Sequence, residues 1–228
     1  MFRYATPAVW PEALGGELPT ISYRDADGLR LYKHPYKDVE FPSVTTVLSN
    51  YEKEGLIEWQ KRVGEETANR IKRKAADRGS AYHKILEEYI LGEDYSKNNH
   101  SAETVVMFKD TKLLLDKYID NIHCTEQTMY SDFLEVAGTG DLIAEWSGIL
   151  SIIDFKTSLR TKKKEWVKSY FMQESAYAVM YEEMTGLPVS QLVTLMYCYD
   201  ELSPYGIPPK IQIFVEKRDN HIQDFIAE

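Results

Sequence analysis

Residues Gly138–Ser158 read GTGDLIAEWSGILSIIDFKTS, and this stretch decides the fold. It contains two strand-like runs rich in Ile, Leu and aromatic residues, Leu142–Trp146 and Ile149–Phe155. Ser147-Gly148 between the runs is a turn signal, so the pattern predicts a β-hairpin with a two-residue loop. The loop length matters because a slip by one residue turns every side chain to the opposite face of the sheet.

The predicted register gathers two aspartates and a lysine on one face of the hairpin. Asp141 lies directly opposite Asp154, and cross-strand neighbours have Cβ atoms about 4.5–5.5 Å apart. Lys156 follows Asp154 by two residues and points to the same face. Like charges opposite one another destabilise a sheet, and a hard cation such as Mg²⁺ or Mn²⁺ removes that conflict. We therefore expect both carboxylates to bind one divalent cation; the alternative is an exposed hairpin end with a solvated Asp–Lys pair.

Other positions in the chain suit the same chemistry. His83 and Glu87 are spaced i, i+4 and share one face of a predicted helix. Gln173 and Tyr177 have the same spacing on the helix that follows the hairpin. Ser43 precedes a short apolar run and suits the N-cap of a short helix, where free backbone N–H groups favour a phosphate. Taken alone, each pattern also fits an ordinary helix face or cap.

Together, and in this order, the segments resemble the PD-(D/E)XK nuclease superfamily. The G-x-x-D motif followed by IIDFKT, within Gly138–Thr157, is similar to the core of that superfamily. RGSAYHKILEEY (Arg78–Tyr89) resembles the G-x-x-x-H helix of its RecB-like branch, and QESAY (Gln173–Tyr177) resembles the Q-x-x-x-Y helix. FPSVTTVLS (Phe41–Ser49) resembles the entry segment of the mitochondrial genome maintenance exonuclease and its phage and bacterial relatives.

The resemblance implies a metal-dependent DNA exonuclease that hydrolyses phosphodiester bonds with Mg²⁺ or Mn²⁺. Lys156 would orient or deprotonate the attacking water and stabilise charge at the phosphate, and Glu87 would orient His83 or place water. The implied metal ligands are His83, Asp141, Asp154 and the backbone carbonyl of Phe155. The implied catalytic residues are His83, Asp141, Asp154, Lys156 and Glu87. The number of cations stays open.

DNA, with a preference for single strands, is the implied partner. The net charge of −9 argues mildly against nucleic acid, but basic residues cluster at Asn69–Arg78 and Lys156–Lys168, beside the site segments. The alternative for each cluster is a solvated helix face. Aromatic residues near the clusters suit stacking on unpaired bases: Trp59, Tyr82, Trp166 and Tyr170. The DNA-binding residues that we expect are Ser43, Thr45, Arg70, Arg73, Lys74, Arg78, Thr157, Lys162, Lys163, Lys164, Gln173 and Tyr177.

At 228 residues, with 43% apolar and 28% charged residues, the chain is long enough for one globular domain with a sizeable core. No apolar run approaches the roughly 20 residues that span a membrane, and the N-terminus has no secretory signal. We expect a cytoplasmic protein of a bacterium or a phage-infected cell, without membrane contact. Cys124 and Cys198 are the only cysteines and cannot supply the four ligands of an iron–sulfur cluster.

The element order predicts an α/β domain of mixed α+β character, and the resemblance implies a central mixed sheet flanked by helices, like the core of restriction endonucleases. Within 1–228 as one nuclease domain, 1–50 would hold a hairpin and the entry segment, 51–125 would be helical, and 126–228 would form the catalytic sheet with its helix. The expected helices are Gly55–Ala76, Ser80–Leu91, Thr104–Ile122 and Trp166–Met184. The expected strands outside the hairpin are Ile21–Tyr23, Leu29–Tyr32, Thr128–Val136, Leu192–Tyr199 and Lys210–Val215.

Our first hypothesis is the exonuclease, acting in DNA replication, recombination or repair. A duplex-specific exonuclease or endonuclease of the same superfamily is an alternative, as is a catalytically inactive nucleic-acid-binding module with the nuclease fold. A hydrolase of small phosphorylated molecules is a third hypothesis. The basic clusters favour a nucleic-acid substrate instead, and the sequence has no Gly-rich loop of the kind that binds phosphates. Cleavage polarity, exonuclease against endonuclease action, DNA against RNA, oligomeric state and protein partners are left open by the sequence.

Overall fold

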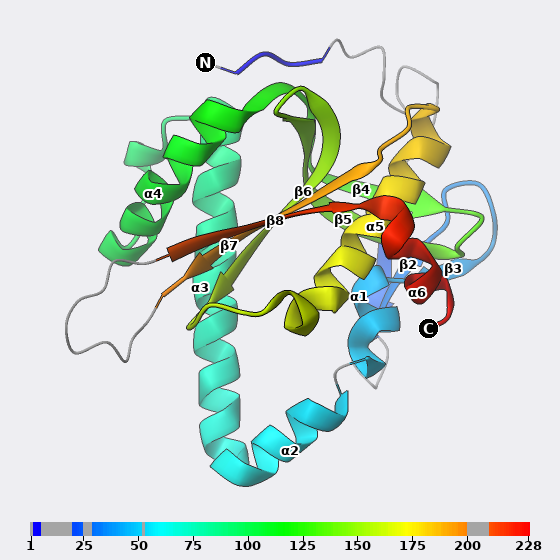
Figure 1. The fold of residues 1–228 in the computed structure, drawn as a ribbon. Coiled ribbons are helices and arrows are strands. Elements are labelled where there is room, and N and C mark those ends of the chain that lie inside the picture. Colours follow the sequence, from blue (N-terminus) through cyan, green and yellow to red (C-terminus); the bar gives the residue numbers. More distant parts are fainter. Residues whose placement is uncertain (1, 6–19, 25–28, 52, 200–209) are drawn as a thin grey trace.

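A five-stranded sheet forms the centre of the fold in the computed structural model, which describes residues 2–5, 20–24, 29–51, 53–199 and 210–228 (Figure 1). The strand order is β4-β5-β6-β7-β8, and all neighbours are antiparallel except the parallel pair β6–β7. This confirms the predicted mixed sheet flanked by helices. The strands are β4 (Ile119–Ser131), β5 (Val136–Trp146), β6 (Ile149–Ser158), β7 (Gln191–Cys198) and β8 (Lys210–Lys217).

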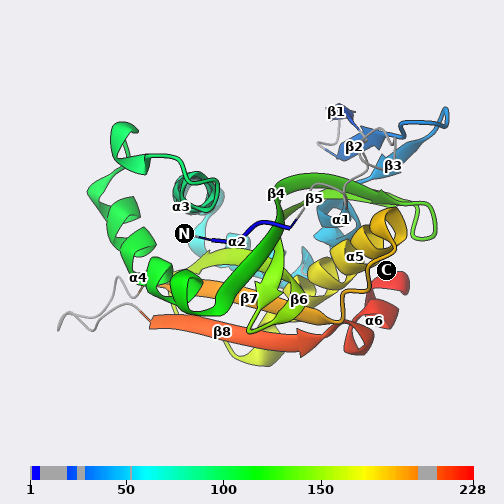
Figure 2. The same ribbon diagram turned by 90° about the horizontal axis from the view of Figure 1, so that it is seen from above.

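Helices cover both faces of this sheet (Figure 2). On one face, α3 (Glu65–Ile90) and α4 (Ala102–Tyr118) pack on an apolar cluster that includes Leu142 and Ile153. On the other, α5 (Lys168–Thr185) and α6 (Ile222–Ile226) pack on a second cluster that includes Ile143 and Ile152. Consecutive strand residues thus belong to opposite clusters, as the twofold period of a strand requires. The short 3₁₀ helices are η2 (Leu48–Asn50), η3 (Tyr95–Lys97), η4 (Lys164–Val167) and η5 (Arg218–Asn220).

The β5–β6 hairpin has the register that the sequence predicts. Ser147 and Gly148 both have positive φ, 53° and 81°, as a two-residue type I′ turn requires. Trp146 pairs with Ile149, and the antiparallel ladder continues to Leu142 and Ile153. The ladder ends there, one position before the two aspartates.

Beyond this point the sheet opens into a fork. The remaining part of β5 pairs only with β4, and the remaining part of β6 pairs in parallel with β7 as far as Ser158 and Cys198. The pleat of β5 also changes phase at Asp141: Ile143 lies in the α5-side cluster, and a Cβ added to Gly140 would meet Tyr177 of α5. Residues three apart share a face only when the alternation is broken between them, so the Asp141 side chain lies where the strands separate.

The N-terminal part forms a small antiparallel sheet and a short helix. Its strands are β1 (Thr20–Arg24), β2 (Arg30–Lys33) and β3 (Glu40–Pro42), which confirms the predicted hairpin; the predicted turn at residues 25–28 lies outside the described residues. Ser43 caps α1 (Val44–Val47), since its Oγ accepts a hydrogen bond from Thr46 N at 3.0 Å. This confirms the predicted cap.

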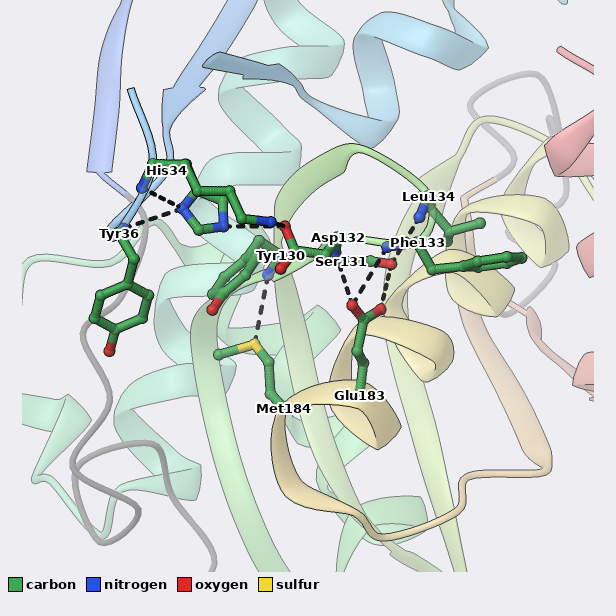
Figure 3. A network of polar contacts seen from close by, with 10 residues as sticks. His34, Tyr36, Tyr130, Ser131, Asp132, Phe133, Leu134, Glu183 and Met184 are labelled. Atoms are coloured by element: carbon green, nitrogen blue, oxygen red, sulfur yellow. Dashed lines mark hydrogen bonds and ion pairs between the residues drawn. The ribbon is translucent and has the colours of Figure 1, made fainter. Parts of the chain in front are cut away.

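A polar network ties this small sheet to the β4–β5 turn (Figure 3). The His34 side chain is 1% exposed; its Nδ1 accepts hydrogen bonds from the backbone of Tyr36 and Lys37, and its Nε2 lies 3.1 Å from Asp132 Oδ1. From the end of α5, Glu183 accepts hydrogen bonds from the Asp132 backbone at 2.8 Å and from the Ser131 hydroxyl at 2.5 Å. One turn therefore fixes the positions of the N-terminal sheet and the C-terminal end of α5.

Two predicted helix boundaries are wrong. The predicted helices Gly55–Ala76 and Ser80–Leu91 are in fact α2 (Lys53–Val63) and one continuous α3. The chain breaks at Gly64, whose φ of 83° is open to glycine and costly for other residues, and not at residues 77–79. Gly79 stays within α3, because one glycine costs only about 1 kcal/mol and good helix formers surround it. As a result α2 and the N-terminal half of α3 project beyond the sheet (Figure 1).

The third boundary error concerns the start of the sheet. The helix predicted over Thr104–Ile122 ends at Tyr118, and β4 begins at Ile119, nine residues before the predicted Thr128. The segment 51–125 is therefore not wholly helical. β5 begins six residues before the predicted run Leu142–Trp146, β6 ends three residues after the predicted run Ile149–Phe155, and the β4–β5 turn lies within the predicted strand Thr128–Val136. The remaining predicted strands and the last predicted helix are within two residues of those observed, whereas β3 and α6 were not predicted.

Gly64 and Gly79 offer a matched test of this helix geometry. A Cβ at either position would meet nothing within 4 Å, so Ala substitution changes only the backbone preference. We expect Gly79→Ala to stabilise the protein by about 0.5–1 kcal/mol, because Ala loses less entropy in a helix. We expect Gly64→Ala to destabilise it by about 1–2 kcal/mol, because its φ of 83° is left-handed. Urea unfolding of both variants measures this; effects of the same sign would contradict the helix break.

Candidate functional site

The fork between β5 and β6 gathers four of the five predicted catalytic residues. His83 comes from α3, Asp141 from β5, and Asp154 and Lys156 from β6. The residues lie 2 to 73 positions apart along the chain, and the register of the hairpin and the packing of α3 on the sheet bring them together.

Asp141 occupies the point where the ladder ends. Its Oδ2 accepts a hydrogen bond from the backbone N–H of Phe155 at 2.8 Å, which replaces the next rung between β5 and β6. Its Oδ1 lies 3.5 Å from His83 Nδ1. The side chain is 13% exposed, so one carboxylate oxygen is fixed by the strand and the other faces the site.

His83 bridges the two strands of the fork. Its Nε2 lies 2.7 Å from the carbonyl oxygen of Phe155. A carbonyl can only accept, so Nε2 is the protonated nitrogen of the ring. Nδ1 consequently faces the carboxylate of Asp141. The prediction that the Phe155 carbonyl ligates a metal stays a prediction, since in this structure that oxygen accepts from His83.

Asp154 and Lys156 form an ion pair on one face of β6, as the sequence predicts for their i, i+2 spacing. Lys156 Nζ lies 2.5 Å from Asp154 Oδ2, and the Asp154 side chain is 3% exposed. Burial raises the pKa of Asp154 to about 6, although Lys156 opposes the shift. Burial alone would lower the pKa of Lys156, but attraction by Asp154 and Asp141 outweighs it and raises that pKa. The lysine is therefore held as a cation.

Gln173 and Tyr177 support this lysine from α5. Lys156 Nζ donates to Gln173 Oε1 at 3.2 Å, and Gln173 Nε2 donates to the Tyr177 hydroxyl at 3.0 Å. The Tyr177 ring packs against the G-x-G segment of β5: a Cβ on Gly138 would lie 2.7 Å from the ring and one on Gly140 3.8 Å from it. Glycine at these positions lets α5 approach the fork and bring Gln173 to the lysine.

Glu126 is a site residue that the sequence analysis missed. It lies on β4 between Thr125, which pairs with Leu142, and Gln127, which pairs with Gly140, so its register position is opposite Asp141. One oxygen of Glu126 and of Asp141 and a ring nitrogen of His83 lie within 4.8 Å of one another. The Glu126 side chain is 35% exposed; burial, followed by repulsion from Asp141, raises its pKa to about 7.

Two other glutamates lie near the fork. Glu87 is half-buried and shares the His83 face of α3, but it is outside the three-residue group of His83, Glu126 and Asp141. Its predicted role stays a prediction. Glu174, which the sequence analysis did not single out, is fully buried and accepts a hydrogen bond from Thr194 of β7; burial, then the charge of Asp154, raises its pKa.

The donor atoms at the fork fit a hard divalent cation. Carboxylate oxygens of Asp141 and Glu126 and an imidazole nitrogen of His83 are the ligand types that Mg²⁺ and Mn²⁺ accept. The predicted ligand Asp154 is outside this three-residue group, and its carboxylate pairs with Lys156. Cys124 and Cys198 are both buried thiols.

The predicted DNA-binding residues are spread over the start of α1, α3, the end of β6 with the segment after it, and α5. Ser43 is 2% exposed and engaged as a cap, while Thr45 beside it is exposed. The segment after β6 is held against β8, because the Lys162 backbone bonds with Gln212 and Lys164 pairs with Glu216. This segment presents Trp166, which is 61% exposed, with Lys163 Nζ 5.4 Å from the ring centre. Thr157 is half-buried near the end of β6. Tyr82 is fully buried, so its predicted stacking role is wrong.

The basic residues of α3 are divided between its sides. At 100° per residue, Lys72 and Arg73 lie about 20° and 80° around the helix axis from His83. Arg70 and Lys74 lie about 140° and 180° away, on the other side. Arg78 is engaged by Glu103 at 2.8 Å and stacks over the Tyr199 ring at 4.6 Å. Contact of Arg73 and Arg78 with DNA stays a prediction, whereas the position of Arg70 and Lys74 on the side away from His83 argues against contact by these two residues.

Comparison with known proteins assigns the chain to no family. No protein-family model matches the chain, and no curated protein matches it in sequence. In the described ranges, every helix falls short of the length and apolar character that crossing a bilayer takes.

The raised pKa of Glu126 predicts that stability depends on pH differently in wild type and in Glu126→Gln. At low pH Glu126 is protonated in both the folded and the unfolded chain, so Glu126→Gln should leave stability unchanged. As pH rises from 4.5 through 7, the unfolded chain releases this proton before the folded one, and wild-type stability falls relative to the variant. After allowance for its partial exposure, we expect a gain of about 1–2 kcal/mol for Glu126→Gln above pH 7.

Urea unfolding in EDTA from about pH 4 to about pH 8 measures this difference. The control is Glu135→Gln: Glu135 also has positive φ, 54°, but is exposed in the β4–β5 turn. A difference between Glu126→Gln and wild type that does not change with pH would show that the fork does not concentrate negative charge.

Proposed function

We propose that this protein is a divalent-metal-dependent deoxyribonuclease, an exonuclease that hydrolyses phosphodiester bonds and prefers single-stranded DNA. The observation that carries the proposal is the convergence of His83, Asp141, Asp154 and Lys156 at one fork of the sheet. Burying these charges together is costly without a ligand. The proposal includes Mg²⁺ or Mn²⁺ as cofactor and the cytoplasm of a bacterium or a phage-infected cell as the place of action.

The metal would be held by Asp141, Asp154 and His83. A divalent cation bound there polarises a phosphate and lowers the pKa of bound water. The Phe155 N–H holds Asp141 in place, and α3 brings His83 to it. The protein's own contribution is therefore a set of ligands whose positions are fixed by backbone hydrogen bonds before DNA binds.

Lys156 has a distinct role in this proposal. Its raised pKa makes it unsuited to remove a proton from water near neutral pH. As a fixed cation beside Asp154 and Gln173, it is suited to orient the attacking water and to stabilise negative charge on the phosphate. Gln173 and Tyr177 act through Lys156 by holding its ammonium group.

The DNA strand would approach the fork between α3 and the segment after β6. Lys72 and Arg73 lie on the His83 side of α3, where they suit backbone phosphates. Trp166 exposes its ring beside Lys163, which suits stacking on an unpaired base. An exposed aromatic residue and scattered cations favour single-stranded DNA over a rigid duplex.

Substitution of the ligands tests the enzymatic proposal. We expect Asp141→Asn, Asp154→Asn and His83→Ala each to slow cleavage by at least about 100-fold, and the double variants to be little worse, because the ligands act as one unit. Asp141→Asn should keep or raise the melting temperature without metal, since it removes a like charge from the fork. The assay follows 5′- and 3′-labelled single-stranded and duplex DNA with Mg²⁺ or Mn²⁺, with Glu135→Gln as the control.

Two results would contradict the proposal. If DNA stays intact after incubation with folded wild-type protein and either metal, the enzymatic function is rejected. If Asp141→Asn then also binds DNA as wild type does, a non-catalytic binding module is favoured. Cleavage by folded Asp141→Asn at the wild-type rate would move the chemistry away from the fork.

Matched pairs on α3 test the strand path. Log K for a single strand should fall with log salt by about 0.7 per phosphate contacted. Neutralising Lys72 and Arg73 together should flatten this slope by about 1.4, because both face the His83 side. Neutralising Arg70 and Lys74, with the same change of charge, should leave the slope unchanged. Anisotropy titrations in Ca²⁺ at several salt concentrations measure the slopes. Equal flattening by both pairs would show only a diffuse electrostatic effect.

A further inference from the structure

We propose that Glu126 is a third carboxylate ligand of the metal centre, binding a cation together with His83 Nδ1 and Asp141 Oδ1. The inference rests on the proposed metal-dependent function and adds a residue from β4, outside the segments that carry the family resemblance. It also assigns the ligand atom of His83. Three observations support it: the hydrogen bond of the histidine, the separation of the three atoms, and the backbone of β4.

The hydrogen bond of His83 fixes which nitrogen is available. Nε2 donates to the Phe155 carbonyl at 2.7 Å, so a neutral ring has its lone pair on Nδ1. Nδ1 lies 3.5 Å from Asp141 Oδ1 and 3.9 Å from Glu126 Oε1. Unprotonated Nδ1 and the two carboxylate oxygens are all acceptors, so no hydrogen bond can form between them and their lone pairs repel one another. A cation that all three atoms bind would replace this repulsion by coordination.

The separation of the three atoms fits coordination. All three lie within 4.8 Å of one another, and atoms at these separations can each be about 2.4 Å or less from a common point. That radius falls within the Ca–O range of about 2.3–2.6 Å and slightly above the Mg–O range of about 2.0–2.1 Å. A small inward movement of the partly exposed Glu126 side chain is enough to complete the site for the smaller cations.

The backbone of β4 directs Glu126 to this point. Cys124 and Met129 both belong to the α5-side cluster although they are five residues apart, so the alternation of β4 is broken between them. Glu126 is the residue in that interval with a positive φ, 48°. The break lies opposite Asp141, where the pleat of β5 also changes phase. The paired irregularities place the Glu126 and Asp141 carboxylates beside His83.

Direct metal titration tests the inference without DNA. We expect Glu126→Gln to weaken Mn²⁺ binding by about 10- to 100-fold, measured by calorimetry and by electron paramagnetic resonance of free Mn²⁺. Glu135→Gln, with the same change of charge at another left-handed glutamate, should stay within about twofold of wild type. Glu87→Gln separates direct ligation from a field effect, because Glu87 is near Glu126 but outside the three-atom group. Melting curves in EDTA verify folding, and Glu126→Asn, which tolerates positive φ, replaces Glu126→Gln if that variant does not fold.

Wild-type affinity in folded Glu126→Gln would overturn the inference, as would equal losses in Glu126→Gln and Glu87→Gln. The outcome is separable from the proposed function. If Glu126→Gln loses Mn²⁺ binding and the wild-type protein cleaves no DNA, Glu126 is supported as a metal ligand and the nuclease function is rejected. If the wild-type protein cleaves DNA and Glu126→Gln binds Mn²⁺ as tightly as wild type, the nuclease function is supported and Glu126 is rejected as a metal ligand.

Discussion

The hydrogen bond from the Phe155 N–H to the Asp141 carboxylate is the interaction on which the site depends. It occupies the position where the β5–β6 ladder would continue, and it ends the pairing at Leu142 and Ile153. A side chain therefore satisfies a backbone donor that a strand would otherwise satisfy, and the two strands separate. The space between them receives His83 from one face of the sheet and Lys156 with Gln173 from the other.

The site combines groups that are individually unfavourable to bury. Asp154 and Lys156 form a buried ion pair, which contributes little net stability because both lose their hydration. Glu126 and Asp154 both have raised pKa values, since burial opposes their charge and Asp141 repels it. Such clustering is typical of functional sites, where a ligand supplies the missing charge. In our account this ligand is a divalent cation, and the rigid fork holds its ligands apart until it binds.

The sequence predicts the parts of the site that local geometry controls. A two-residue loop with Gly148 fixes the hairpin register, and the i, i+2 and i, i+4 spacings place Lys156 beside Asp154 and Gln173 beside Tyr177. Glu126 was not predictable, because its position depends on a positive φ in mid-strand that no local pattern indicates, and on a strand whose start at Ile119 follows a helix without a breaker. The continuity of α3 through Gly79 was missed for a related reason: packing of the helix on the sheet outweighs a weak local preference.

The most direct test of the central claim is a crystal structure with Mn²⁺, in which anomalous scattering locates the metal. Our account predicts an anomalous peak at the fork, within coordination distance of Asp141 Oδ1, and an Asp141→Asn crystal without it. The Asp141 Oδ2 should keep its hydrogen bond to Phe155 N, which is 2.8 Å in the present structure. Occupied Mn²⁺ sites elsewhere, with none at the fork in the same crystals, would contradict the claim that this opening of the sheet is a metal centre.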